Sequence, residues 1–194
     1  MRTVNLSSVV DADRALCEKI AEREGVNLTA CYQCGKCSAG CPMAEEMDLP
    51  PQRIMRMLQL GLVNEALNAK GPWICAQCMV CSTRCPQNID ITDIMREVRL
   101  ESHAQERRAV PESDTFESLF IKKVRNNGRS NEQYLAAGYN MHSGHLMQDM
   151  TNAPKMFTKG LVGIKRNRVK DREAVQQLID KCEQSARRAR EADE

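Results

Sequence analysis

The chain has 194 residues, and its 28 Lys and Arg against 26 Asp and Glu leave a formal net charge of +2. A charge so near zero creates no large field of one sign, so we expect no nucleic acid or anionic lipid as a partner. No stretch approaches about 18 consecutive apolar residues, so no membrane span is predicted. The first residues lack the apolar core of a secretory signal, and we expect a cytoplasmic protein.

Residues 1–27 are predicted to form an extended arm followed by a helix. Apolar residues recur at helical spacing from Asp11 onward, and Gly25 follows as a stop signal. Cys17 lies on this helix, and we interpret it as a small buried hydrophobe rather than as a metal ligand. The expected apolar face consists of Ala12, Ala15, Leu16 and Ile20.

Eight of the ten cysteines fall into two runs of identical spacing. The first cysteine run, residues 31–42, reads Cys31-x-x-Cys34-x-x-Cys37-x-x-x-Cys41-Pro42. The second cysteine run, residues 75–86, reads Cys75-x-x-Cys78-x-x-Cys81-x-x-x-Cys85-Pro86. This is the C-x₂-C-x₂-C-x₃-C-P spacing of bacterial iron–sulfur sites. The sequence therefore predicts two [4Fe–4S] clusters as cofactors.

The same spacing predicts which cysteines share a cluster. Three thiolates, each separated from the next by two intervening residues, wrap around one cubane, and the fourth cysteine of each run ligates the other cluster in two-cluster proteins. The expected ligands of the first cluster are Cys31, Cys34, Cys37 and Cys85. The expected ligands of the second cluster are Cys75, Cys78, Cys81 and Cys41. No catalytic residue is predicted, because nothing in the chain resembles a nucleophile with its base.

Two zinc sites or a set of disulfides would also use eight cysteines. Structural zinc sites pair their ligands as C-x₂₋₄-C, whereas each run here holds four cysteines closed by Cys-Pro. Disulfides need an oxidising compartment, and 10 cysteines in 194 residues are about 5% of the chain, below the roughly 8–10% of a disulfide scaffold. Iron–sulfur clusters are therefore the favoured interpretation.

The segments that flank the second run are predicted to be helical. A helix begins at Pro51 and ends at Gly61, and a second short helical piece covers residues 62–69. Trp73 and Ile74 lead into the second run, and Trp73 is expected to cover a cluster. After that run, a helix is predicted from Asp90 to about Ala109. Its expected apolar positions are Ile91, Ile94, Met95, Val98 and Ala104.

The C-terminal part is harder to interpret. Pro111 is expected to end the preceding helix and begin a linker, after which an apolar stripe indicates another helix. That stripe consists of Phe116, Leu119, Phe120 and Val124. Residues 126–167 hold many apolar residues without periodicity, so no element is predicted there. A last helix is predicted over about Val169–Arg190, with Cys182 on its buried face.

Nothing in the chain alternates with period two, and the predicted fold class is all-α. The two runs and their helical surroundings resemble the alpha-helical ferredoxin domain, and most closely the iron–sulfur C subunit of heterodisulfide reductase. The segments that carry this resemblance are Cys31–Pro42, Trp73–Cys78 and Cys85–Met95. The resemblance implies that residues 28–110 form the dicluster ferredoxin module, preceded by residues 1–27 as an arm and helix. Residues 111–194 are predicted to be a helical docking region, because their apolar residues need burial against a partner.

The resemblance also implies a role. Members of that family pass electrons through two [4Fe–4S] clusters from a flavin-containing subunit to a disulfide-reducing subunit. The alternatives are an iron–sulfur subunit of another flavoenzyme, of the succinate, fumarate or glycolate-oxidase type, and a cluster-based redox sensor. The chain has no adjacent Cys-Cys pair, which the substrate-reducing cluster of fused relatives uses. An electron relay without catalysis of its own is therefore the expected function.

Overall fold

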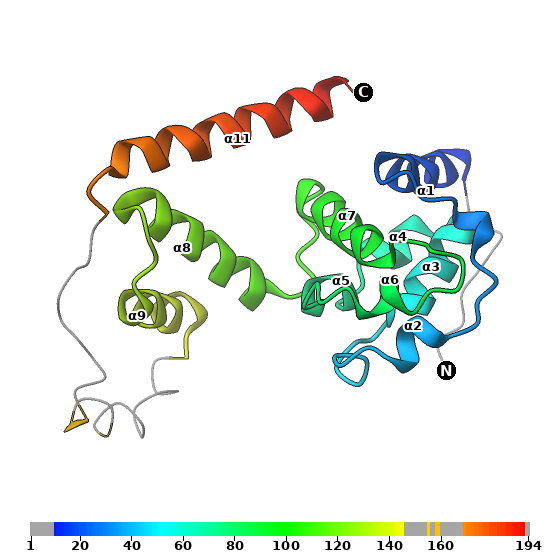
Figure 1. The fold of residues 1–194 in the computed structure, drawn as a ribbon, viewed down its shortest axis with the longest axis horizontal. Helices are drawn as coiled ribbons and strands as arrows, with labels where there is room; N and C mark the ends of the chain where they lie inside the picture. The colour runs from blue at the N-terminus through cyan, green and yellow to red at the C-terminus, as the bar shows by residue number, and fades with distance from the viewer. Residues whose placement is uncertain (1–9, 146–154, 156–157, 160–168, 193–194) are drawn as a thin grey trace. The chain divides into compact units, whose positions relative to one another are not determined.

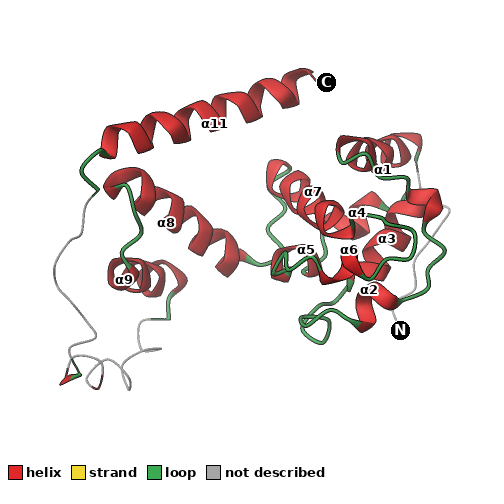
Figure 2. Ribbon diagram, viewed as in Figure 1, coloured by secondary structure: helices red, strands yellow, loops and turns green. Residues whose placement is uncertain are grey.

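The computed structural model describes residues 10–145, 155, 158–159 and 169–192. Its secondary structure is helical throughout the described residues, which confirms the all-α prediction (Figures 1 and 2). The chain divides into two compact units, Met1–Pro111 and Glu112–Glu194. No helix in the described part of the chain is long and apolar enough to cross a membrane.

The N-terminal unit surrounds the two cysteine runs with helices, labelled in Figure 1. Two short helices lie inside the runs, α2 (Lys36–Ala39) in the first and α6 (Val80–Thr83) in the second. The others are α1 (Asp11–Arg23), the 3₁₀ turn η2 (Leu28–Ala30), α3 (Pro51–Gln59), α4 (Val63–Leu67), α5 (Gly71–Ile74) and α7 (Ile91–Ala104). Each run is thus followed by one of the longer core helices, α3 or α7.

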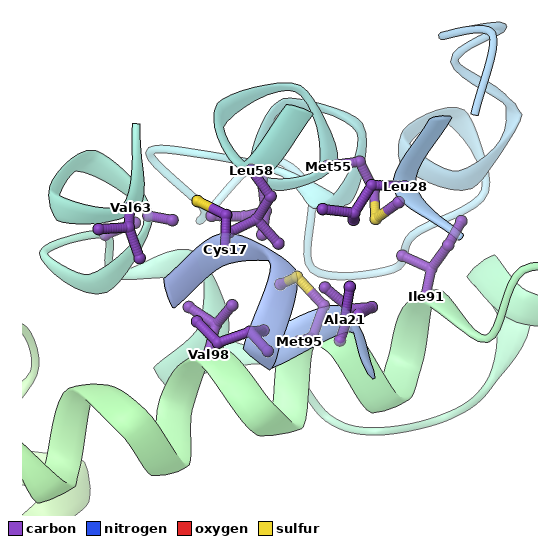
Figure 3. Close-up of a cluster of buried hydrophobic side chains, with 14 of the residues drawn as sticks. Cys17, Ala21, Leu28, Met55, Leu58, Val63, Ile91, Met95 and Val98 are labelled. Atoms are coloured by element: carbon purple, nitrogen blue, oxygen red, sulfur yellow. The ribbon is translucent and has the colours of Figure 1, made fainter. Parts of the chain in front are cut away.

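The core of this unit lies between α1, α3, α4 and α7. Ile54 and Met55 of α3 are fully buried, as are Ile94, Met95 and Val98 of α7. Figure 3 shows side chains of α1 and α3 directed into the same cluster as Met95 and Val98. Burying one such aliphatic side chain stabilises the fold by about 1.5–3 kcal/mol, so this cluster dominates the stability of the unit.

Helix α1 has the predicted bounds but presents a different face. Its buried residues are Cys17, Ile20 and Ala21, whereas Ala12 and Ala15 are exposed. The alanines carry too little apolar surface to direct the helix, and the larger Ile20 together with Cys17 sets its rotation. The prediction that Cys17 is a core residue is confirmed, because its side chain is 1% exposed.

Helix α7 ends at Ala104, five residues earlier than predicted. Glu106 has φ 57°, and the backbone N–H of Arg107 donates to the carbonyl of Ser102 at 2.8 Å, which closes the helix end. Four of its five predicted apolar positions are buried, and Ala104 is exposed.

Ion pairs join α1 to α7 across this core. Arg23 contacts Glu97 at 2.9 Å and Glu101 at 3.0 Å. Arg96 contacts Glu24 at 2.9 Å. Glu97 is charged but only 8% exposed, because the guanidinium of Arg23 lets its carboxylate lie against the core.

Asp48 fixes the approach to the second cysteine run. Its Oδ1 accepts hydrogen bonds from the backbone N–H groups of Leu49 at 2.7 Å, Lys70 at 2.9 Å and Gly71 at 3.0 Å. The side chain thereby caps α5 from a distant segment. Gly71 lies so close to the carbonyl of Leu49 that a Cβ atom at this position would collide with it. These contacts hold the segment that follows the first run, at Asp48 and Leu49, against the segment that leads into the second run, at Lys70 and Gly71.

The C-terminal unit contains α8 (Pro111–Asn127), α9 (Glu132–Ser143) and α11 (Arg172–Ala192). Pro111 occupies the first position of α8, so the prediction that it begins a linker is wrong, and its ring suits a helix start. Phe116 of α8 packs edge-on against Tyr139 of α9, with ring centroids 5.9 Å apart. Arg125 of α8 joins Asp180 and Glu183 of α11 at 2.8 Å each.

Much of the apolar surface of this unit is exposed. Phe116 is 45% exposed, Met141 70% and Leu178 62%. Cys182 of α11 is also exposed, so its prediction as a core residue is wrong. Among the apolar residues of the segment 126–167, the following lie outside the described residues: Leu146, Met147, Met150, Met156, Phe157, Leu161 and Val162.

Candidate metal centre

The two cysteine runs have the same backbone conformation. Gln33 and Gln77, at equivalent positions, have φ 62° and 50°. Gly35 and Met79, two residues further on, have φ 80° and 63° and precede α2 and α6. Left-handed residues in such turns gather backbone N–H groups into anion-binding concavities, including those of iron–sulfur sites. The repeat seen in the sequence is therefore a repeat in three dimensions.

Burial of the cysteines follows the same repeat. In each run the first and fourth cysteines are half-buried, the second is exposed and the third, on the short helix, is buried. The half-buried cysteines are Cys31, Cys41, Cys75 and Cys85; the exposed ones are Cys34 and Cys78; the buried ones are Cys37 and Cys81.

One apolar pocket brings cysteines of both runs together. Cys41 of the first run lines it beside Cys75, Cys78 and Cys81 of the second. The remaining lining residues are Pro42, Met43, Pro51, Ala76, Val80 and Thr92. These four cysteines are the set that the spacing assigned to the second cluster. Four thiols converging on an apolar pocket are a donor set suited to an iron–sulfur cluster.

The cysteines of the other predicted set also have neighbours across the two runs. The phenol of Tyr32 hydrogen-bonds to Cys34 and lies within the electrostatic influence of Cys85. Loss of hydration raises the pKa of Tyr32, and the two sulfurs raise it further. Cys85 of the second run thus lies close enough to Tyr32 of the first run to influence the pKa of its phenol.

Cluster binding changes the charge state of these sulfurs. Burial raises the pKa of Cys37, and hydrogen bonds from Ser38 oppose that rise. Burial likewise raises the pKa of Cys75, against a backbone hydrogen bond from Gln77. A coordinating metal deprotonates its thiols outright. Once iron is bound, the groups of Ser38 and Gln77 therefore donate their hydrogen bonds to thiolates. The donor set therefore fits the anionic cluster better than it fits free thiols.

The arrangement differs from a site for one metal ion. Among the described residues, no three His, Cys, Asp or Glu side chains converge closely enough to bind a single ion. A cubane binds each of its four cysteines through a different iron, so its thiolates stand further apart than those around one zinc ion.

Two further residues reach cysteine sulfurs and were not predicted to do so. The Nε2 of Gln33 donates to Cys31 Sγ at 3.4 Å and to Gln59 Oε1 at 3.1 Å. The Oγ1 of Thr92 lies 3.2 Å from Cys81 Sγ. Gln33 stands inside the repeat and is matched by Gln77, which is a signal that the sequence offers. Thr92 is on α7, and no local pattern marks it.

Trp73 was expected to cover a cluster. In the structure its ring lies beside His103 of α7, with centroids 6.4 Å apart. It is buried but is not among the residues that line the cysteine pocket. Its role toward the clusters remains a prediction.

The all-helical frame and the repeated cysteine turns define an iron–sulfur protein with two [4Fe–4S] clusters. Residues 27–89 match the family described as the 4Fe-4S dicluster domain. The chain is similar, at 40% identity over 78 residues, to the iron-sulfur C subunit of the CoB--CoM heterodisulfide reductase of Methanopyrus kandleri, covering 40% of this chain and 41% of the relative.

It is also similar to the C subunit of the H(2):CoB-CoM heterodisulfide,ferredoxin reductase of Methanothermobacter thermautotrophicus and of Methanothermobacter marburgensis. Each is 31% identical over 101 residues, 52% of this chain and 55% of the relative. The chain thus spans about half the length of these relatives. The resemblance to the iron–sulfur C subunit of heterodisulfide reductase is confirmed for the part of the chain that holds the clusters.

Proposed function

We propose that the chain relays electrons from a flavin-containing subunit to a disulfide-reducing subunit in a complex of the heterodisulfide reductase type. The observation that carries this proposal is the pocket in which Cys41 joins Cys75, Cys78 and Cys81. If the last cysteine of each run ligates the cluster held by the other run, the two clusters must lie side by side. Bound clusters supply one-electron chemistry, and two adjacent ones make a path through the chain.

The proposed ligands of the first cluster are Cys31, Cys34, Cys37 and Cys85, and those of the second are Cys75, Cys78, Cys81 and Cys41. The pocket supports the second set, and the position of Cys85 near Tyr32 and Cys34 supports the first. Cys81 lies close enough to Cys37 to contribute to the raised pKa of the Cys37 thiol. This supports a short separation between the two clusters, which an electron relay requires.

The proposed exchange is balanced in electrons and protons. A disulfide takes up two electrons, and two protons from water, to give two thiols, and a reduced flavin gives up two electrons and releases its protons to water. The chain passes these electrons one at a time, so each disulfide needs two transfers. Its own residues hold the clusters and exclude water from the pocket, and they bind neither the flavin nor the disulfide.

The flavin-containing and disulfide-reducing subunits are proposed as partners because the similar proteins are named as subunits of heterodisulfide reductases. The C-terminal unit is the proposed docking part. Phe116, Met141 and Leu178 expose large apolar side chains, and exposed apolar patches mark partner surfaces. A cytoplasmic location is proposed because reducing conditions keep cluster-forming thiols from pairing as disulfides.

The test is electron transfer through the reconstituted protein. Holoprotein with both clusters is mixed anaerobically with its two partner subunits, the flavin-containing one and the disulfide-reducing one, obtained from the native host. We expect thiol formation that requires the chain and that is lost in Cys34→Ser and Cys78→Ser variants. Cys182→Ser serves as the matched control, since Cys182 belongs to neither cysteine run. Full disulfide reduction without the chain would refute the relay.

A further inference from the structure

Thr92 is positioned to act on one cluster and not on the other. It is the second residue of α7, is 7% exposed and lines the pocket with Cys41, Cys75, Cys78 and Cys81. Its Oγ1 lies 3.2 Å from Cys81 Sγ, within hydrogen-bonding distance for sulfur. A buried hydroxyl so placed requires a partner, and Cys81 is one of the two side chains it contacts.

The contact between Thr92 and Ser82 decides which atom donates in the hydrogen bond between Thr92 and Cys81. The backbone N–H of Thr92 donates to Ser82 Oγ at 3.0 Å, and the hydroxyl of Ser82 donates to Thr92 Oγ1 at 3.0 Å. Ser82 has a single hydroxyl hydrogen, which this contact uses. The hydrogen of Thr92 therefore remains for Cys81. A thiolate bound to iron carries no hydrogen and can only accept a hydrogen bond. The Thr92 hydroxyl, with its hydrogen available, and the Cys81 thiolate, which needs a donor, therefore match.

We propose that the Thr92 hydroxyl donates a hydrogen bond to the Cys81 thiolate and thereby raises the reduction potential of the second cluster. This inference rests on the proposed function only in taking Cys81 as a cluster ligand. Hydrogen bonds to the sulfurs stabilise the additional negative charge of the reduced cluster. Removing the donor therefore lowers the midpoint potential of that cluster.

In the first cysteine run the hydroxyl that reaches the third cysteine comes from the run itself. Ser38 corresponds to Ser82 and accepts from the backbone N–H of Gln52, the second residue of α3, at 2.9 Å. Here the serine itself hydrogen-bonds to Cys37, and the side chain of Gln52 turns away to donate to the carbonyl of Gln33 at 3.0 Å. The hydroxyl at the third cysteine therefore comes from α7 in the second run and from the run's own serine in the first, so a change at Thr92 acts on the second cluster alone.

The experiment is an anaerobic redox titration of the holoprotein followed by electron paramagnetic resonance. Thr92→Val removes the hydroxyl at nearly constant volume, and Thr92→Ser keeps it. Thr83→Val is the matched control, because the exposed Thr83 on α6 donates to the carbonyl of Met79 and to no sulfur. The signal of the second cluster is identified as the one that Cys41→Ser perturbs.

We expect the midpoint potential of the second cluster to fall in Thr92→Val, to return to the wild-type value in Thr92→Ser and to stay unchanged in Thr83→Val. The first cluster should not shift in any of them. If Thr92→Val fails to assemble the cluster, Thr92→Ala removes the same hydroxyl and must show the fall.

Assembled clusters with an unchanged potential in Thr92→Val, or an equal fall in Thr92→Ser, would overturn the inference. The proposed function would survive either result. Wild-type protein that binds no cluster under reconstitution would instead refute the proposed function itself.

Discussion

Cys41 and Cys85 each close one cysteine run in the sequence and are assigned to the cluster of the other run. Replacing Cys41 by Ser should alter the spectrum of the cluster held by Cys75, Cys78 and Cys81, because Cys41 lines their pocket. Replacing Cys85 by Ser should alter the other cluster. Electron paramagnetic resonance of each reduced variant separates the two signals. A change confined to the cluster of its own run in Cys41→Ser would show that the ligands do not cross.

Cys17 tests the opposite role, a cysteine that serves only packing. Burial, with the nearby carboxylates of Asp13 and Glu18, raises its pKa from 9.0 to about 12. The folded chain therefore favours the neutral thiol. This contribution to stability is complete below pH 9.0 and is lost as the pH rises towards 12.

We expect Cys17→Ala to leave both cluster spectra unchanged. The melting temperature of the wild type relative to this variant should be constant below pH 9.0 and should decline above it. The measurement is anaerobic thermal unfolding of both proteins across that range. A difference that grows with pH would mean that the thiolate is favoured in the folded state, as a metal ligand would be.

At the scale of the elements, Asp48 and Gly71 hold the segment after the first cysteine run against the segment before the second run. Asp48→Ala leaves the N–H groups of Lys70 and Gly71 without this acceptor and should cost about 1 kcal/mol, the usual loss of a helix cap. Gly71→Ala should cost more, because its Cβ would collide with the carbonyl of Leu49. Thermal unfolding and iron content report both effects.

Asp90→Ala is the matched control for Asp48→Ala. Asp90 precedes α7 as Asp48 lies beside α5, but its side chain makes no cap hydrogen bond. Stability should therefore change little in this variant. Equal losses in Asp48→Ala and Asp90→Ala would remove the special role given to Asp48.

Helices with strong local signals were predictable from the sequence, and those that depend on distant contacts were not. Pro51 at a helix start and the spacing of Ile91, Ile94, Met95 and Val98 are local features, and α3 and α7 followed them. Helix α9 was missed, because only Leu135 in it is buried and its other apolar residues give no clear face.

The candidate site divides in the same way. The cysteine spacing and the repeated glutamines are visible in the sequence, since they lie within short turns. The contact of Thr92 with Cys81 depends on how α7 packs on α6, which local patterns do not encode. The burial of Glu97 likewise depends on Arg23, which is far away in the chain.

At the scale of the whole molecule, the two units should differ in their roles. Every residue of the main buried cluster lies at or before Val98, so the N-terminal unit has a core of its own. A chain that ends at Pro111 should therefore keep both clusters but fail to copurify with the flavin-containing and disulfide-reducing subunits. Full-length protein from the same host is the control. Loss of the clusters on truncation would place residues 112–194 within the ferredoxin fold instead.

The central claim is that one chain holds two [4Fe–4S] clusters on eight cysteines. Its most direct test is the iron and acid-labile sulfide content of anaerobically purified protein. Two cubanes require eight iron and eight sulfide per chain. We expect these contents in the wild type, with no decrease in the Cys17→Ala and Cys182→Ala variants. Two zinc ions per chain with no sulfide would contradict it.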